Sequence, residues 1–304
     1  MAERREIART AGRALDLLTL LVDRGQHGLT ARELSELLGA PRTSVGDLLK
    51  VLATRGFVGP TADGRGWRLD SRVLQLGNAY LHEFSVREVG RSAMRELSRR
   101  SGLTSQMAVL EEKEVVYIER QDARLTTEEY TRSEPRLVTD LGSRLPAYCT
   151  SLGKAMLAAL PEEEIDRLYA PPAQLVPRTK NTITSLARLK TELAAIRRRG
   201  YAVDNEEATD GIVCIGSAII GSDGRPEAAI SLAGLRGRLS AETIESLGRM
   251  VGRAAAHISS ARGGVVRRLP AVRGGARRGR RSAAGPGKVR PGAIASRRRR
   301  VGAA

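Results

Sequence analysis

The stretch LPAYCTSLGKAMLAAL, residues 145–160, places Ser151 three residues before Lys154. In this S-x-x-K spacing a lysine can deprotonate a serine, so the pair predicts either a serine acyl-transfer site or a helix start with the same pattern. Such an enzyme would also carry S-D-N and K-T-G elements, and neither tripeptide occurs in the chain. We therefore expect the chain not to be an enzyme, and an acyl-transfer enzyme using Ser151 and Lys154 stays as the alternative.

As a helix start, the same stretch offers a different chemistry. Thr150 or Ser151 can cap the helix, and the free backbone N–H groups around Ser151, Leu152 and Gly153 then lie at the positive end of its dipole. That end of a helix suits a bound carboxylate. Lys154 falls in the first turn, where we expect a solvated charge.

The formal net charge of +17 is concentrated at the C-terminal end of the chain. Residues 263–304 hold thirteen Lys or Arg and no Asp or Glu, which leaves +4 for residues 1–262. This segment is rich in Gly, Ala, Pro and Arg without a regular period, which predicts a disordered Arg-rich tail. The tail either is a solvated extension or binds phosphates independently of DNA sequence. A protein whose DNA binding depends mainly on such a tail would be an architectural DNA-binding protein.

Other features exclude several classes of protein. Cys149 and Cys214 lie 65 positions apart without a CxxC pair, which argues against a disulfide framework and a zinc site. The three histidines are scattered, so we expect neither a metal nor a cofactor. No signal-peptide pattern opens the chain, and its longest nearly apolar run, residues 211–221, is too short to cross a bilayer. We expect a cytoplasmic protein that contacts no membrane.

Three helices are predicted in the first seventy residues. The first ends near Gly25, and its apolar residues at helical spacing are Ala11, Ala14, Leu15, Leu18, Leu21 and Val22. The second runs from Thr30, at capping-box spacing from Glu33, to Gly39. It is expected to bury Leu34, Leu37 and Leu38. The third follows with Pro41 at a first helical position, and its apolar stripe is Val45, Leu48, Leu49 and Leu52.

Two short strands, FVG and GWRL, flank the hairpin dipeptide Asp63-Gly64 and complete a winged helix-turn-helix over residues 1–70. Short hydroxyls and an Arg at the start of the third helix can meet base edges, and other basic residues can meet phosphates. The candidate DNA-binding residues are Arg42, Thr43, Ser44 and Lys50 on the helix, and Arg65 and Arg68 on the wing. The expected partner is double-stranded operator DNA.

Two neighbouring residues of the third helix are unfavourable for tight binding to DNA. Asp47, on the exposed side, repels phosphate unless it accepts a hydrogen bond from a cytosine amino group. Gly46 costs the helix about 1 kcal/mol relative to Ala. Specificity is then expected to depend heavily on Arg42, Thr43 and Ser44.

A linker helix is predicted over residues 71–86. Its apolar stripe is larger than a monomer needs, which predicts a homodimer or homotetramer. Such a dimer would set two recognition helices about one turn of DNA apart. The stripe consists of Val73, Leu76, Gly77, Tyr80, Leu81 and Phe84.

Residues 87–262 change to a mixed pattern of strands and helices. Two antiparallel hairpins are predicted, TSQMAVL with VVYIER and IVCIGSAII with EAAISLAG. Helices are predicted at 87–100, 151–160, 162–169, 182–199 and 241–262. The fold class is therefore α+β: a winged helix-turn-helix, a linker helix, a C-terminal antiparallel-sheet α/β domain of the GAF-like, effector-binding type, and the tail at 263–304.

Three segments of the chain together resemble the IclR family of bacterial transcriptional regulators. They are GRALDLLTLL with LTARELSELLGAPRTSVGDLLKVLATRGFV, then LPAYCTSLGKAMLAALPEEE, and last RRGYAVDNEEATDGIVCIGSAIIGSDGRPEAAISLAG. The resemblance covers about residues 8–262. Within the family, LGSRLPAYCTSLGKAMLA is most similar to regulators of aromatic-acid catabolism, the protocatechuate and β-ketoadipate pathway group.

The resemblance implies a ligand-responsive regulator of catabolic genes that binds a small effector, often a carboxylate or an aromatic acid. It also implies which residues contact the effector: Leu141, Gly142, Ser151, Leu152, Gly153, Asp204, Cys214 and Ser231. Relatives often carry a second hydroxyl two residues after Ser231, where this chain has Ala233. For Cys214 core packing remains an alternative, and for Asp204 a turn.

Overall fold

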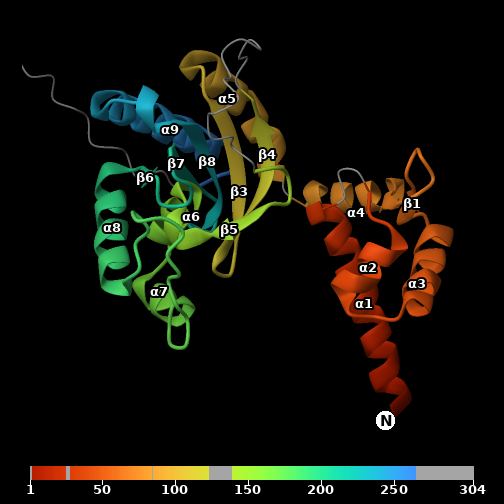
Figure 1. The fold of residues 1–304 in the computed structure, drawn as a ribbon. Helices are drawn as coiled ribbons and strands as arrows, with labels where there is room; N and C mark the ends of the chain where they lie inside the picture. The colour runs from red at the N-terminus through yellow and green to blue at the C-terminus, as the bar shows by residue number, and fades with distance from the viewer. Residues whose placement is uncertain (1, 25–27, 84, 123–138, 265–304) are drawn as a thin grey trace, which may run out of the picture. The chain divides into compact units, whose positions relative to one another are not determined.

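The computed structural model describes residues 2–24, 28–83, 85–122 and 139–264. The predicted basic tail lies outside these ranges from residue 265 onward, as does Phe84 of the predicted linker helix. The described chain forms an N-terminal helical domain with a small hairpin and a larger domain built on one sheet (Figure 1).

The N-terminal domain contains the predicted helix-turn-helix and its wing. Helices α1 (Ala2–Arg24), α2 (Ala31–Leu38) and α3 (Arg42–Thr54) are followed by strands β1 (Val58–Pro60) and β2 (Trp67–Leu69), which pair in antiparallel fashion. The predicted capping box is present, because Thr30 accepts from the Glu33 backbone while the Glu33 side chain accepts from Thr30. Gly39 ends α2 with φ 57°, a conformation that favours glycine.

The core of this domain differs in detail from the predicted apolar stripes. Among the residues of α1 whose burial is described, Leu17 and Leu21 are buried, whereas Leu15 and Val22 are both exposed. In α2, Leu34 is buried but Leu37 is 40% exposed. In α3, Val45 and Leu49 are buried as expected, and the helix begins at Arg42 with Pro41 in the capping position, one residue later than predicted. The wing closes over this core through Trp67.

The boundary between the linker helix and the next helix lies earlier in the chain than predicted. Helix α4 (Ser71–His82) is shorter than the predicted linker helix, and α5 (Ser85–Ser101) begins two residues earlier than predicted. The described side chains of α4 include no buried residue, and Leu74 and Leu76 are exposed. The predicted linker helix extends to residue 86, whereas α4 ends at His82.

One six-stranded sheet organises the larger domain, with the strand order β5-β4-β3-β8-β7-β6. The two predicted hairpins are present as β3 (Thr104–Glu111) with β4 (Glu114–Gln121), and β7 (Ile212–Ile220) with β8 (Pro226–Leu235). Two short edge strands were not predicted, β5 (Arg144–Pro146) and β6 (Ala202–Asn205). All neighbouring strands are antiparallel, and β3 and β8 join the two hairpins at the centre.

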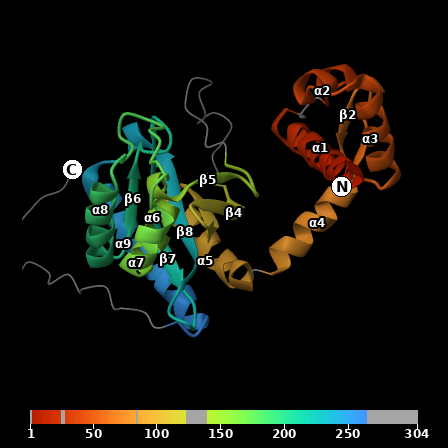
Figure 2. The same ribbon diagram turned by 90° about the horizontal axis from the view of Figure 1, so that it is seen from below.

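Helices cover both faces of this sheet (Figures 1 and 2). Helices α5 and α9 (Ala241–Ala261) pack on one face, and α6 (Ser151–Ala159), α7 (Glu162–Leu168) and α8 (Leu186–Arg199) lie on the other. Two short 3-10 helices complete the domain, η2 (Ala147–Cys149) and η3 (Arg236–Arg238). The helix predicted at 182–199 begins only at Leu186, because Thr182 lies in a loop and donates to the Glu207 carbonyl at 2.7 Å.

Candidate functional site

A cavity of about 40 Å³ lies where the N-terminus of α6 meets the sheet. That volume holds roughly one to three water molecules. Its lining combines residues from β3, β4, β5, β6, β7, β8 and α6 with the segment between β6 and β7. The polar residues of the lining are Gln106, Tyr117, Thr139, Thr150, Ser151, Asp204, Thr209, Cys214 and Ser231.

Strand alternation explains why polar groups reach this cavity. Successive side chains of a strand point to opposite faces, so Ile230 and Leu232 of β8 pack under α5 and α9 while Ser231 faces α6. The register then aligns the lining residues. Ser231 lies opposite Gln106 of β3, and Asp204 of β6 lies opposite Cys214 of β7.

The N-terminus of α6 is held against the sheet by close backbone packing. Thr150 is the cap, and its hydroxyl accepts the backbone N–H of Gly153 at 3.0 Å. An added Cβ on Gly153 would overlap the backbone of Ala147, and one on Gly216 of β7 would lie 2.9 Å from the carbonyl carbon of Ser151. Only glycine at both places lets the helix start reach the cavity, with the N–H groups of Ser151 and Leu152 at its positive end.

Two hydroxyls in the lining have no hydrogen-bond partner in the described part of the chain. Ser151 and Ser231 are at most 1% exposed, and the Oγ of each is unpaired. A buried hydroxyl without a partner costs about 1–3 kcal/mol, so such groups call for an explanation. A ligand that accepts hydrogen bonds from both serines would supply the missing partners.

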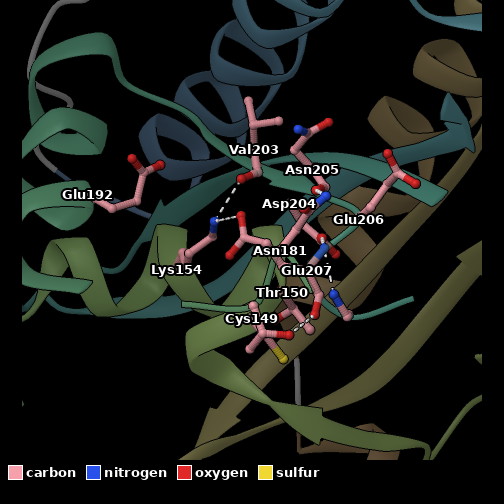
Figure 3. Close-up of polar contacts among 12 residues, drawn as sticks. Cys149, Thr150, Lys154, Asn181, Glu192, Val203, Asp204, Asn205, Glu206 and Glu207 are labelled. Atoms are coloured by element: carbon pink, nitrogen blue, oxygen red, sulfur yellow. Dashed lines mark hydrogen bonds and ion pairs between the residues drawn. The ribbon is translucent and has the colours of Figure 1, made fainter. Parts of the chain in front are cut away.

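Lys154 is not the solvated charge that the sequence suggested. Its side chain is completely buried, and its ammonium donates to the Val203 carbonyl at 2.7 Å and to the Glu207 carboxylate (Figure 3). These contacts connect α6 to β6 and to the segment that follows it. The ammonium is therefore committed to Val203 and Glu207, while the Ser151 hydroxyl stays unpaired, so the two side chains do not form the hydrogen-bonded pair that nucleophilic attack requires.

Asp204 is the one carboxyl group among the described lining residues, and it is 3% exposed. Its Oδ1 accepts from the backbone N–H groups of Glu207 at 2.7 Å and Ala208 at 3.3 Å. Burial raises the pKa of Asp204 to about 7, although those hydrogen bonds and the Lys154 ammonium oppose the rise. Burial also raises the pKa of Glu207 and of the Cys214 thiol.

The structure brings together five of the eight residues predicted to contact an effector. Ser151, Leu152, Asp204, Cys214 and Ser231 line the cavity. Gly153 packs behind it, and Leu141 and Gly142 lie on an exposed turn whose Gly142 N–H donates to the Tyr117 carbonyl. Ala233 is buried beside Cys214 and is not part of the described lining.

Several lining residues were not found from the sequence. Gln106 and Tyr117 were recognised only as strand residues. Glu207, which lies outside the lining and pairs with Lys154, was not singled out at all. The alternation of β3 and β4 could have placed Gln106 and Tyr117 on one face. Nothing in the sequence pairs Lys154 with Glu207, which lies 53 residues away.

The predicted DNA-binding residues lie on the surface of the N-terminal domain. Arg42, Thr43 and Lys50 of α3 are exposed, as are Arg65 and Arg68 of the wing, and Ser44 is half-buried. Lys50 pairs with Asp47 at 3.3 Å, and both side chains are more than 70% exposed. Asp47, which was expected to repel phosphate, therefore also pairs with Lys50, one of the candidate DNA-binding residues.

The described ranges contain neither a metal-binding cluster nor a membrane-spanning helix. No three His, Cys, Asp or Glu side chains in these ranges are arranged to hold a metal ion. None of the helices described is long and apolar enough to cross a bilayer.

Comparison with known proteins assigns both domains to one family. The IclR helix-turn-helix domain model matches residues 10–61, and the model for the C-terminal domain of bacterial IclR transcriptional regulators matches residues 78–260. The transcriptional repressor IclR of Escherichia coli K12 is 30% identical over 254 residues, which cover 83% of this chain and 89% of that protein.

Solved structures agree with this assignment. The crystal structure of the Thermotoga maritima IclR protein superposes with a TM-score of 0.71 at 30% identity, covering 84% of this chain and 99% of the other. An IclR homologue from Microbacterium hydrocarbonoxydans, solved with 4-hydroxybenzoate, gives a TM-score of 0.65 at 20% identity, covering 82% of this chain and 99% of the other. That second likeness concerns the fold alone.

Proposed function

Because the chain belongs to the IclR family of bacterial transcriptional regulators, a family of ligand-responsive DNA-binding proteins, we propose that the cavity at the N-terminus of α6 binds its effector. The observation that carries this proposal is the pair of buried, unpaired hydroxyls of Ser151 and Ser231 facing one cavity. They lie beside the free N–H groups of a helix start, which favour an anion. The effector class we propose is a small carboxylate or aromatic acid that controls catabolic genes. An aromatic acid would have to widen the cavity, which in this structure has room for only a few water molecules.

Effector binding would act by shifting a pre-existing equilibrium between arrangements of two DNA-binding domains in a homodimer or homotetramer. The exposed apolar residues of α4, Leu74 and Leu76, support association of the chain with a second copy. The DNA contacts would come from Arg42, Thr43, Ser44 and Lys50 of α3 and from Arg65 and Arg68 of the wing.

A thermal-shift screen of the purified protein against monocarboxylates tests the effector class. Benzoate, 4-hydroxybenzoate and short aliphatic acids are the first probes, since the Microbacterium homologue holds one of them. Each acid that raises the melting temperature is then tested for a change in affinity for the DNA upstream of the protein's own gene. An acid that binds without changing DNA affinity would contradict the switching mechanism.

Replacing Ser231 with Ala is expected to separate stability from ligand binding. The substitution removes an unpaired buried hydroxyl, so the free energy of unfolding of the ligand-free protein should stay equal or rise by up to about 1 kcal/mol. Affinity for the acid found in the screen should fall by about tenfold, since one hydrogen bond to a charged group is lost. Isothermal titration calorimetry and urea denaturation measure the two effects.

Ser105→Ala is the matched control for this prediction. Ser105 is also fully buried with an unpaired Oγ, but it does not belong to the described lining of the cavity. It should match Ser231→Ala in stability and leave ligand affinity unchanged. Equal losses of affinity in both variants would argue against the cavity as the binding site.

Replacing Asp47 with Asn is expected to strengthen DNA binding. The change removes a negative charge from the exposed side of α3 and releases Lys50 from its ion pair. Since both groups are exposed, the gain should be modest, about 0.5–1 kcal/mol at low salt, and should shrink as salt is added. Fluorescence anisotropy with labelled operator DNA at several salt concentrations measures it.

Glu245→Gln provides the control for charge alone. Glu245 forms an exposed ion pair with Arg249 in α9, outside the helix-turn-helix, and its removal changes net charge by the same amount. If Glu245→Gln strengthens DNA binding as much as Asp47→Asn, then the effect comes from net charge and not from the position of Asp47 on α3.

A further inference from the structure

The charges around the cavity do not match a simple anion site. In the described lining there is no Lys or Arg, and the one group that can be ionised at neutral pH is the acid Asp204. A ligand carboxylate would therefore enter a site whose own charge is negative or zero. Two carboxylates in contact repel each other strongly when both are ionised, and such a pair usually retains one proton.

The nearest buried cation does not resolve this mismatch. Lys154 donates directly to the Glu207 carboxylate and to the Val203 carbonyl, and no hydrogen bond joins it to Asp204 (Figure 3). Its single positive charge is balanced by Glu207. The buried cluster of Lys154, Glu207 and Asp204 then carries one negative charge in excess whenever Asp204 is ionised.

Asp204 has one oxygen available to a ligand. Its Oδ1 accepts the two backbone N–H groups of Glu207 and Ala208, which fixes the orientation of the carboxyl group. No described residue forms a hydrogen bond with Oδ2, and Asp204 is part of the cavity lining. A proton on Oδ2 would make this oxygen a hydrogen-bond donor directed at a bound acceptor.

We propose that Asp204 binds the ligand as a neutral carboxylic acid, donating a hydrogen bond from Oδ2 to a ligand carboxylate, so that each anion enters the site together with one proton. The proton comes from solvent, and no covalent bond of the ligand changes. This inference rests on the proposed function of the cavity as an effector site. It makes Asp204 the residue that sets the charge state of the ligand the site accepts.

The other groups that face Asp204 leave it as the main site of titration. Cys214 of β7, Tyr117 of β4 and Cys149 of η2 have pKa values raised by burial, which keeps them neutral near pH 7. Lys154 of α6 is balanced by Glu207, and Arg178 donates to the Ala208 carbonyl at 3.3 Å. Burial raises the pKa of Asp204 itself to about 7 and also raises that of Glu207, so Glu207 is the group that a control must separate.

Calorimetric titration of the full-length protein from pH 5.5 to pH 8.5 tests the proposal. The probes are benzoate, 4-hydroxybenzoate and acetate, with benzamide, 4-hydroxybenzamide and acetamide as uncharged counterparts. Above pH 7 the dissociation constant of the best-binding acid should rise by about tenfold per pH unit, because each binding event must protonate Asp204. At pH 8, titrations in phosphate and in Tris should show about one proton taken up per ligand bound. The amides should show neither effect.

Asp204→Asn and Glu207→Gln are the matched variants. Asparagine keeps a hydrogen-bond donor at this position without a titrating proton, so Asp204→Asn should bind the acid with no pH slope and no proton uptake. Glu207→Gln keeps an acceptor for Lys154 and should retain both. Carboxylate binding that is independent of pH in the wild type, or a pH slope that survives in Asp204→Asn, would overturn the proposal.

The outcomes also separate this inference from the proposed function. If an acid binds and changes DNA affinity equally at every pH, the effector site stands and the proton-coupled inference fails alone. If no acid and no amide binds even at pH 5.5, and none changes DNA affinity, both fail.

Discussion

Replacing Lys154 with Met is expected to lower the free energy of unfolding of the sheet domain by about 3–5 kcal/mol at pH 8. The substitution keeps an unbranched apolar side chain, one atom shorter than lysine, but leaves Glu207 buried without its cation. One oxygen of Glu207 already has no partner in the described structure, and the Val203 carbonyl would lose its donor as well. The loss should shrink at acidic pH, where Glu207 takes up a proton and no unpaired charge remains buried.

Two spectroscopic signals locate the loss of stability. The only tryptophan in the chain, Trp67, packs in the core of the N-terminal domain, so its fluorescence reports unfolding of that domain. Far-UV circular dichroism reports both domains. Lys154→Met should shift the urea transition seen by circular dichroism and leave the Trp67 transition in place.

Lys190→Met is the matched control, since Lys190 pairs with both Glu162 and Asp166 but is 29% exposed. Its loss should cost much less stability than the loss of Lys154, because solvent screens the pair. A second variant, Lys154→Met with Glu207→Leu, should recover most of the stability by removing both charges. If Lys154→Met costs no more than Lys190→Met, the buried pair does not hold α6 to the segment after β6.

Gly153→Ala is expected to destabilise the sheet domain by about 2–3 kcal/mol, although alanine is the better helix former. The added Cβ would overlap the backbone of Ala147, so either η2 or the first turn of α6 must move. Because that turn carries the N–H groups of Ser151 and Leu152, ligand affinity should fall together with stability. Urea denaturation followed by circular dichroism, and calorimetry with the acid found in the screen, measure the two losses.

Gly46→Ala makes the same substitution in α3 and should have the opposite sign. No atom outside the helix lies within 4 Å of a Cβ built on Gly46, so the change should stabilise the N-terminal domain by about 1 kcal/mol. The Trp67 transition measures it. A loss of stability in both variants would contradict the expectation that Gly46 has free space for a Cβ and that helix propensity determines the effect of its replacement.

The helix-turn-helix could be predicted because its signals are local. The capping box of Thr30 and Glu33, the left-handed Gly39 and the Asp63-Gly64 turn each depend on a few adjacent residues. The buried face of α1 could not be predicted in the same way. Residues 14–22 are apolar on most sides of the helix, so periodicity alone did not distinguish Leu17 from Leu15.

The cavity could be predicted in part, for a different reason. The resemblance to the IclR family supplied Ser151, Asp204, Cys214 and Ser231, and the structure places these four in one wall. The partners of Lys154 lie in or just after the four-residue strand β6, which is too short to give a clear sequence pattern. A lysine in a first helical turn is ordinarily exposed, and only tertiary packing shows that this one is buried.

The most direct test of the central claim is the affinity of the full-length protein for its own upstream DNA, measured by fluorescence anisotropy with and without a bound acid. For the wild type, the acid should change the dissociation constant for DNA by about fivefold or more. For Ser231→Ala, DNA affinity without the acid should equal that of the wild type, and the response should shift to about tenfold higher acid concentration. An acid that binds in the cavity yet leaves the wild-type affinity for DNA unchanged would contradict the claim that this cavity controls DNA binding.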